Sequence, residues 1–163
     1  MTAETCPHYY ALNEHLLLSE DADYRMNPPL RSEKDNTAII EGLIDGTIDC
    51  IATDHAPHTQ EEKKDFLTAP NGVCGLETSL AAGITYLVNK GYMTLNKLIF
   101  HMSTAPAQIM GLEGGILTRG KPADIVLFDP CEEWKVEPEN LHGKSHNTPF
   151  KNTQLTGRVK YTI

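Results

Sequence analysis

The chain is short of basic residues, of aromatic residues and of long apolar runs. Its 163 residues include 14 lysines and arginines against 22 acidic residues, giving a formal net charge of −8, and only 7 % are aromatic. This balance argues against binding to the phosphate backbone of nucleic acids. No apolar run approaches the ~20 residues that a membrane-spanning helix needs. The sequence therefore favours neither a nucleic-acid-binding protein nor a membrane protein.

The sequence also lacks paired cysteines. Cys6, Cys50, Cys74 and Cys131 lie far apart and form no CxxC motif, so a disulfide framework is not expected. Reduced thiols in a cytoplasmic compartment are the better prediction. With 40 % apolar and 22 % charged residues, the composition is ordinary for a soluble globular protein of one domain, or of one domain with a small appendage.

The first third of the chain carries a strand, helix and strand pattern. Residues 2–6 predict a short strand that stops at Pro7, because proline supplies no ladder donor. A helix is expected from an N-cap at Ser32 to a C-terminal Gly46. Residues 48–52 are nearly all apolar and predict a strand buried on both faces. Elements of these lengths form a βαβ unit, which implies parallel pairing.

The remaining segments predict a loop, two helices and a β appendage. Residues 53–75 are polar and glycine-bearing, and residues 76–91 and 94–111 read as helices, the second interrupted at Pro106. From Gly114 the chain has turn glycines and then alternating, strand-like stretches. The sequence thus predicts a small β element appended to an α/β body.

Asp54, His55 and His58 follow directly after the strand expected at 48–52. In parallel α/β folds, functional groups gather at the carboxyl ends of strands. An aspartate there can ligate a metal or move a proton. From the spacing alone, however, an aspartate that caps a turn beside two solvated histidines is an equally good interpretation.

Two further stretches could contribute to such a site. "MNPPLR" contains Asn27, a donor and acceptor, and Arg31, a bidentate donor, which together suit a small ligand with carboxylate and amide groups. Taken alone, a turn stiffened by two prolines is the better interpretation of this stretch. "NGVCG" at 71–75 has glycines that let backbone N–H groups approach a ligand, but a flexible loop explains it equally well.

Taken together, the motifs resemble one family, the dihydroorotases of the amidohydrolase superfamily. The stretches that carry the resemblance occur in the family's order: "TAETCPHYYALNEHLLL", "MNPPLRSEKD", "DGTIDCIATDHAPHTQEEK", "GVCGLETSL", "GKPADIVLFDP" and "KSHNTPF". The resemblance implies zinc-dependent, reversible hydrolysis of dihydroorotate to N-carbamoyl-L-aspartate in pyrimidine biosynthesis. It also implies an α/β fold, the C-terminal fragment of a (β/α)8 TIM barrel: residues 1–112 would hold its last two strands and 113–163 part of a small β-sandwich domain.

The resemblance also implies roles for individual residues. Asp54 resembles the family's metal-ligating aspartate, which shuttles a proton between water and the leaving ring nitrogen. Asn27 and His58 resemble residues that hold the substrate carboxylate, and Gly75 lies in the loop whose backbone binds the pyrimidine ring. The family often has an apolar residue where this chain has Asn71. His8 resembles a frequent family histidine but is not assigned as a metal ligand.

Most of the family's zinc ligands have no counterpart in this sequence. None of the seven histidines stands in the H-x-H pair that the family uses, and a (β/α)8 barrel takes about 250 residues. We therefore expect this chain alone to be inactive and to bind little zinc, since one carboxylate cannot form a tight site. Open strand edges favour a homo-oligomer, a swapped dimer or aggregation.

Three other functions are compatible with the sequence. Another cyclic amidohydrolase, such as an allantoinase or hydantoinase, is the nearest. A non-catalytic dihydroorotase-like subunit that associates with aspartate carbamoyltransferase is the second, although Asp54, Asn27 and His58 argue against such decay. An autonomous α/β binding domain is the third, and it leaves the six ordered family stretches unexplained.

Overall fold

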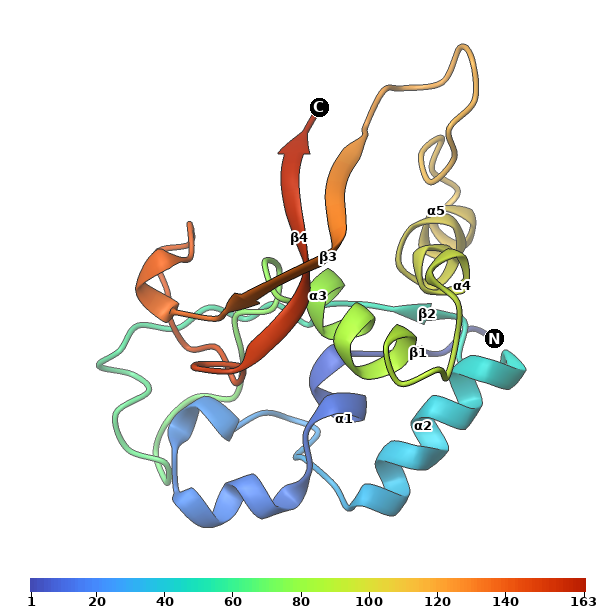
Figure 1. The fold of residues 1–163 in the computed structure, drawn as a ribbon. Helices are drawn as coiled ribbons and strands as arrows, with labels where there is room; N and C mark the ends of the chain where they lie inside the picture. The colour runs from blue at the N-terminus through green and yellow to red at the C-terminus, as the bar shows by residue number, and fades with distance from the viewer.

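Two short parallel strands lie at the centre of the N-terminal part of the protein. The computed structural model describes residues 1–163, and in it β1 (Glu4–Thr5) pairs in parallel with β2 (Cys50–Ile51) (Figure 1). The expected parallel pairing and the burial of β2 are both confirmed. The strands are shorter than predicted, although backbone bonds flank them: the N–H groups of Asp49 and Ala52 donate to the carbonyls of Ala3 and Thr5, each at 2.9 Å.

The crossover helix α2 (Glu33–Asp45) has the ends that the sequence predicts. The Ser32 side chain accepts from the N–H of Asp35, and the Asp35 carboxylate accepts from the N–H of Ser32, which forms a complete capping box. Gly46 ends the helix in the left-handed conformation, at φ 86°. Local side-chain chemistry therefore sets both ends of α2.

We expect Ser32→Ala to destabilise the protein by about 1 kcal/mol, because it removes one of the two reciprocal hydrogen bonds of the capping box. Chemical denaturation of the wild type and the variant measures the difference. Ser103→Ala, in an exposed helical position, is the matched control and should change stability by less than about 0.5 kcal/mol. Equal losses for the two serines would contradict a capping role.

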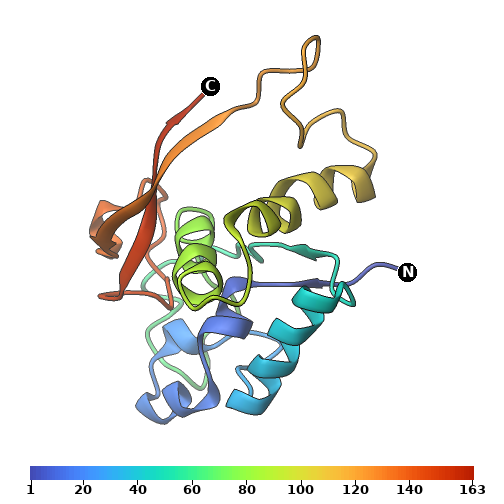
Figure 2. The ribbon, with the colours of Figure 1, turned by 45° about the vertical axis from the view of Figure 1, so that its right-hand side comes forward.

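Three short helical elements separate β1 from α2. They are α1 (Pro7–Ala11) and the 3-10 helices η1 (Glu14–Ser19) and η2 (Ala22–Tyr24). After β2, residues 53–75 run as the expected loop, interrupted by a single parallel bridge between His55 and Val73. Figure 2 shows α1, η1 and η2 below the strand pair.

Two long helical segments follow the loop, each with a π-helical turn. The first is α3 (Ser79–Gly83) continued by η3 (Ile84–Val88). The second is α4 (Leu95–Ile99), η4 (Phe100–Thr104) and α5 (Ala105–Met110). The sequence predicted an interruption of the second helix at Pro106, but the chain stays helical there. A π turn immediately before Pro106 changes the hydrogen-bond pattern, so the missing proline N–H does not end the helix.

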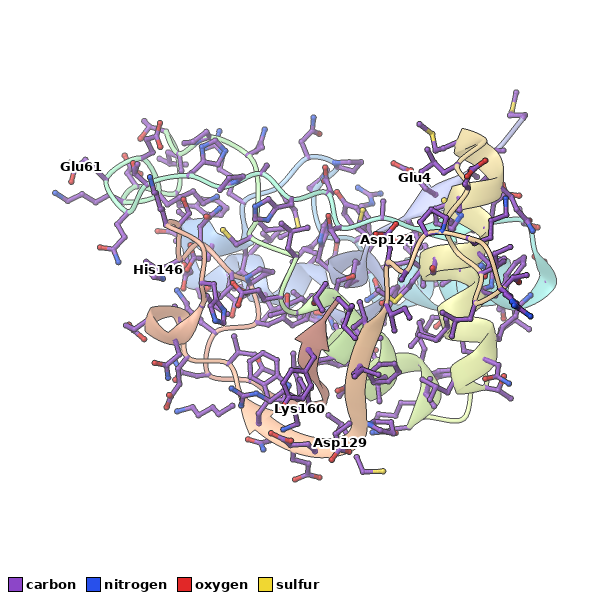
Figure 3. The ribbon with its side chains drawn as sticks, turned by 90° about the horizontal axis from the view of Figure 1, so that it is seen from above. Glu4, Glu61, Asp124, Asp129, His146 and Lys160 are labelled. Carbon is purple, nitrogen blue, oxygen red and sulfur yellow. The ribbon has the colours of Figure 1, made fainter.

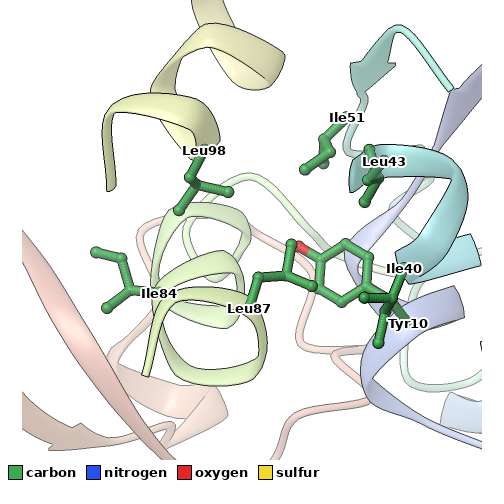
Figure 4. Close-up of a cluster of buried hydrophobic side chains, with 7 residues drawn as sticks. All are labelled: Tyr10, Ile40, Leu43, Ile51, Ile84, Leu87 and Leu98. Carbon is green, nitrogen blue, oxygen red and sulfur yellow. The ribbon is translucent and has the colours of Figure 1, made fainter. Parts of the chain in front are cut away.

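The main apolar core lies between the β1–β2 strand pair and the helices (Figure 4). Seven buried residues form it: Tyr10, Ile40, Leu43, Ile51, Ile84, Leu87 and Leu98. They come from α1, α2, β2, η3 and α4, so helices cover the strand pair as the α/β class requires. The predicted α/β fold class is confirmed at this level.

A long antiparallel hairpin forms the C-terminal part. β3 (Val126–Lys135) pairs with β4 (Gln154–Thr162), and the 3-10 turn η5 (Pro138–Asn140) lies between them. The alternating strands predicted in this region are thus confirmed. A second apolar cluster joins the hairpin to α3, and it consists of Ala81, Ala82, Val136, Phe150 and Leu155.

The boundary between the barrel part and the small β domain, expected at residue 112, stays a prediction. No helix has the length and apolarity to cross a membrane.

An ion-pair group ties the hairpin region to η2 and gives a pH-dependent prediction. Lys151 Nζ lies 2.6 Å from Asp21 Oδ2 and 2.8 Å from Asp23 Oδ2. Burial acts to raise the pKa of Asp21, but hydrogen bonds from Lys151 and Asp23 lower it overall. Burial acts to lower the pKa of Lys151, but hydrogen bonds to both aspartates raise it overall.

These shifts fix the pH window in which the ion pair stabilises the fold. The Asp21 contribution is present above its usual value of 3.8 and is lost as pH falls through its lowered native pKa. The Lys151 contribution is present below 10.5 and is lost as pH rises through its raised native pKa. We expect Lys151→Met to be less stable than wild type at pH 7 and to converge with it in acid, as measured by urea denaturation. A difference that stays constant from neutral pH into acid would contradict the ion-pair contribution.

Candidate active site at the strand ends

Three potential metal ligands meet at the carboxyl end of the strand pair. Cys6 directly follows β1, His8 lies in α1, and Asp54 comes three residues after β2. Their ligand atoms all lie within 4.8 Å of one another. The neighbouring strand ends expected from the sequence therefore do bring functional groups to one edge.

Asp54 is held in an uncommon backbone conformation. Its φ is 49°, in the left-handed region that favours glycine, asparagine and aspartate. Its side chain is 51 % exposed, and its Oδ2 lies 4.0 Å from Nε2 of the buried His8. The carboxylate thus faces both solvent and an imidazole, which suits a group that binds a metal or exchanges a proton.

His8 is buried with an unsatisfied ring nitrogen. Its Nε2 has no hydrogen-bond partner although the residue is only 1 % exposed. Burial lowers its pKa to about 4, against a smaller raising effect of the Asp54 charge. The imidazole is therefore neutral at pH 7, and Nε2 faces the Asp54 carboxylate. The sequence reasoning assigned His8 no metal role, and only the fold shows how close it lies to Asp54.

Cys6 contributes a buried thiol to the same edge. Burial, with a smaller contribution from the nearby charges of Asp54 and Glu4, raises its pKa to about 12. The thiol is therefore protonated at neutral pH and would lose its proton only on binding a metal. Carboxylate, imidazole and thiolate are the three ligand types that zinc uses in proteins. The donor set at this edge fits a zinc ion.

Asn27 lies in a segment that docks onto α1. The peptide between Asn27 and Pro28 is cis, and the Pro28 carbonyl accepts a 2.8 Å hydrogen bond from the Tyr9 hydroxyl. The Tyr9 ring in turn packs edge-on against His8, at 4.2 Å between centroids. Asn27 itself is exposed and makes no hydrogen bond. The structure therefore ties this segment to the strand-end cluster.

His58 and Gly75 lie in the two adjacent parts of the 53–75 loop. His58 Nε2 is 3.1 Å from the Asn71 carbonyl oxygen, and no hydrogen bond or ion pair joins His58 to Asp54. The Gly75 N–H donates to His55 Nδ1 at 3.2 Å. A Cβ at Gly75 would lie 2.8 Å from the Thr53 carbonyl oxygen, so glycine is needed for this close approach.

Two polar residues of this region were missed by the sequence reasoning. Lys63 and Asn147 are both buried, and their side chains bond to several backbone carbonyls of the loop. Lys63 stands in the charged stretch "EEKKD", which gives no signal of burial. Asn147 stands in "KSHNTPF", which supported the resemblance but whose contacts no sequence pattern predicts.

The chain is similar to amide hydrolases along its whole length. The profile of the Amidohydrolase family matches residues 3–163. A dihydroorotase of Clostridioides difficile is 51 % identical over 164 residues, covering 100 % of this chain and 38 % of the relative. A dihydroorotase of Lactococcus lactis is 46 % identical over 164 residues, with the same two coverages. The chain thus spans about 38 % of the length of the curated relatives it matches.

Solved structures of related enzymes have the same fold. An L-hydantoinase (dihydropyrimidinase) of Arthrobacter aurescens superimposes with a TM-score of 0.92 at 32 % identity, covering 99 % of this chain and 37 % of that one. A dihydropyrimidinase of Brevibacillus agri gives a TM-score of 0.88 at 30 % identity, with the same coverages. Because the family profile matches nearly every residue, the chain belongs to the amidohydrolase family.

Proposed function

We propose that this chain is part of a dihydroorotase, which reversibly hydrolyses dihydroorotate to N-carbamoyl-L-aspartate in pyrimidine biosynthesis. The observation that carries the proposal is the 46–51 % identity to dihydroorotases over the whole chain. The strand-end cluster of Asp54, His8 and Cys6 supplies donors suited to such chemistry. The free cysteines are compatible with a cytoplasmic enzyme.

The residues of the cluster would divide the work between metal binding and proton transfer. Asp54 would hold a zinc ion, which when bound supplies a Lewis acid that polarises the ring amide. The Asp54 carboxylate, which is half-exposed, would accept a proton from water and return it to the leaving ring nitrogen. The neutral, buried His8 would face that carboxylate, with its Nε2 4.0 Å from Asp54 Oδ2.

Substrate binding would fall to residues on the surrounding loops. Asn27 is exposed in the segment docked on α1, and its amide is free to bond a substrate carboxylate. His58 would bind the same carboxylate from the adjacent loop, and the backbone at Gly75 would contact the ring. The imidazole of His58 is half-buried and bonded to Asn71, so it is already oriented before substrate binds.

The chain would form the C-terminal part of a (β/α)8 barrel. β1 and β2 would be its last two strands, with residues 113–163 in a small β domain. The 990 Å³ cavity between α3 and the β3–β4 hairpin and the strand edges of β1 and β2 are surfaces that further chain segments could cover. A homo-oligomer, a swapped dimer or an association with aspartate carbamoyltransferase would bury the same surfaces.

The test is a ring-opening assay on the intact protein that contains this chain. We expect hydrolysis of dihydroorotate, and much slower hydrolysis of hydantoin or allantoin, with bound zinc found by elemental analysis. The 163-residue chain alone should be inactive and hold little zinc, because Asp54 is the one exposed donor of the cluster, whereas His8 and Cys6 are buried and the Cys6 thiol must first lose its proton. Faster turnover of hydantoin would instead assign a hydantoinase, the activity that the names of the structural neighbours carry.

A further inference from the structure

The two loop segments that carry His58 and Gly75 lie side by side. Residues 55 and 73 form a parallel bridge, and the N–H of Ala56 donates to the Val73 carbonyl at 2.9 Å. This bridge supplies few hydrogen bonds of its own, so a loop of this length needs other contacts to hold a fixed shape. Two buried polar side chains supply them.

The first is Asn147, which comes from the segment before β4. Its side-chain oxygen accepts from the His58 N–H at 3.1 Å and from the Cys74 thiol at 2.9 Å. Its side-chain nitrogen donates to the carbonyls of Ala56 at 3.2 Å and Gly72 at 3.1 Å. These four contacts use both donors and both acceptor positions of the amide. Asn147 therefore joins the two segments from a point 89 residues away from His58.

The second is Lys63, which lies in the loop between the two segments. Its Nζ donates to the carbonyls of Arg25, Pro70 and Gly72, each at 3.1 Å, and the residue is only 8 % exposed. No carboxylate forms an ion pair with it. The three donors of the ammonium group are thus all spent on backbone carbonyls, which is an arrangement that fixes a loop.

Lys63 and Asn147 meet at one atom, the Gly72 carbonyl oxygen. Gly72 has φ +142°, and a Cβ there would lie 2.6 Å from the Ala56 Cβ and 3.0 Å from His58 Nε2. At Gly72 the two segments therefore leave no room for a side chain. In Figure 3, His146, the neighbour of Asn147, and Glu61, near Lys63, lie on the side of the molecule away from Glu4 of β1.

We infer that Lys63 and Asn147 act as a carbonyl clamp, a pair of positioning residues that hold His58 and the 71–75 segment in the arrangement that binds substrate. The inference rests on the proposed function for its effect on substrate binding. Neither side chain belongs to the strand-end cluster, so the clamp acts on affinity for a ring-shaped carboxylate substrate and not on the proton-transfer step.

Asn147→Asp tests the clamp with almost no change in side-chain size. The aspartate keeps an acceptor for the His58 N–H but loses both donors and places a negative charge beside two carbonyl oxygens. In the intact enzyme, we expect KM for dihydroorotate to rise by about tenfold or more and kcat to change less than about threefold. Asn140→Asp, at an exposed position, carries the same charge change and should leave both constants unaltered.

Lys63→Met gives an independent test at the other half of the clamp. It should also raise KM, whereas Lys64→Met, at an exposed position whose ion pair is only with Glu61, should not. Because both residues bond to the Gly72 carbonyl, the double variant should raise KM by less than the product of the single effects. Two results would overturn the positioning role. One is a KM change in the double variant equal to the product of the two single changes, and the other is a fall in kcat at constant KM.

Amide hydrogen exchange of the intact protein separates this inference from the proposed function. In both clamp variants, the amide hydrogens of peptides spanning 56–58 and 72–74 should exchange at least about tenfold faster, while those of α2 stay protected. This readout holds whichever ring the enzyme opens. If the protein does not act on dihydroorotate but these amide hydrogens exchange faster in the variants, the proposed function fails and the clamp stands. Unchanged exchange in both variants refutes the clamp.

Discussion

Asp54→Asn in the intact enzyme should lower kcat for dihydroorotate hydrolysis by about a thousandfold or more. The substitution removes the carboxylate that would hold the metal and carry the proton, and general acid–base catalysis alone contributes about 10²–10⁴-fold. Asparagine has nearly the same size as aspartate and also tolerates the left-handed φ of 49° found here. The fold should therefore survive the change. Steady-state kinetics and metal content per chain measure the two effects together.

Asp124→Asn is the matched control for this experiment. Asp124 is exposed, lies in the segment before β3, and forms no ion pair, so the same loss of charge should leave kcat within about twofold of wild type. Circular dichroism of both variants tests whether the fold is intact. An Asp54→Asn enzyme that keeps a tenth of the wild-type rate would remove Asp54 from the chemistry and favour its role as a turn residue.

Phe150→Ala should destabilise the protein by about 3–5 kcal/mol, the usual cost of removing a buried aromatic side chain. Phe150 is 2 % exposed and belongs to the cluster that joins α3 to the hairpin. Its ring also packs against that of Tyr86, at 6.3 Å between centroids. Losing this ring would leave a cavity between α3 and β4, which the flanking backbone cannot close without moving.

Phe100→Ala is the matched control for the stability experiment. Phe100 is 40 % exposed in η4, so the same substitution should cost about 1 kcal/mol or less. Urea denaturation of the two variants and the wild type gives the comparison. If both phenylalanines cost the same, the hairpin would not depend on the second core cluster for its attachment to α3.

The sequence by itself determined the parts of this protein that depend on neighbouring residues. The ends of α2 follow from Ser32, Asp35 and Gly46, since a capping box and a left-handed glycine act within one helical turn. The βαβ unit follows from an apolar strand that comes shortly after an amphipathic helix, and it placed Asp54 at the carboxyl edge of that strand. Both inferences needed only local spacing.

The tertiary structure alone decided which distant side chains complete the site. His8 approaches Asp54 across 46 residues of sequence, and Asn147 reaches Ala56 across 91. Lys63 is buried because carbonyls from two separate segments, Arg25 in one and Pro70 and Gly72 in the other, converge on its ammonium group. No local pattern encodes such contacts, because a buried polar group is stabilised only when the folded chain brings its partners within hydrogen-bond distance.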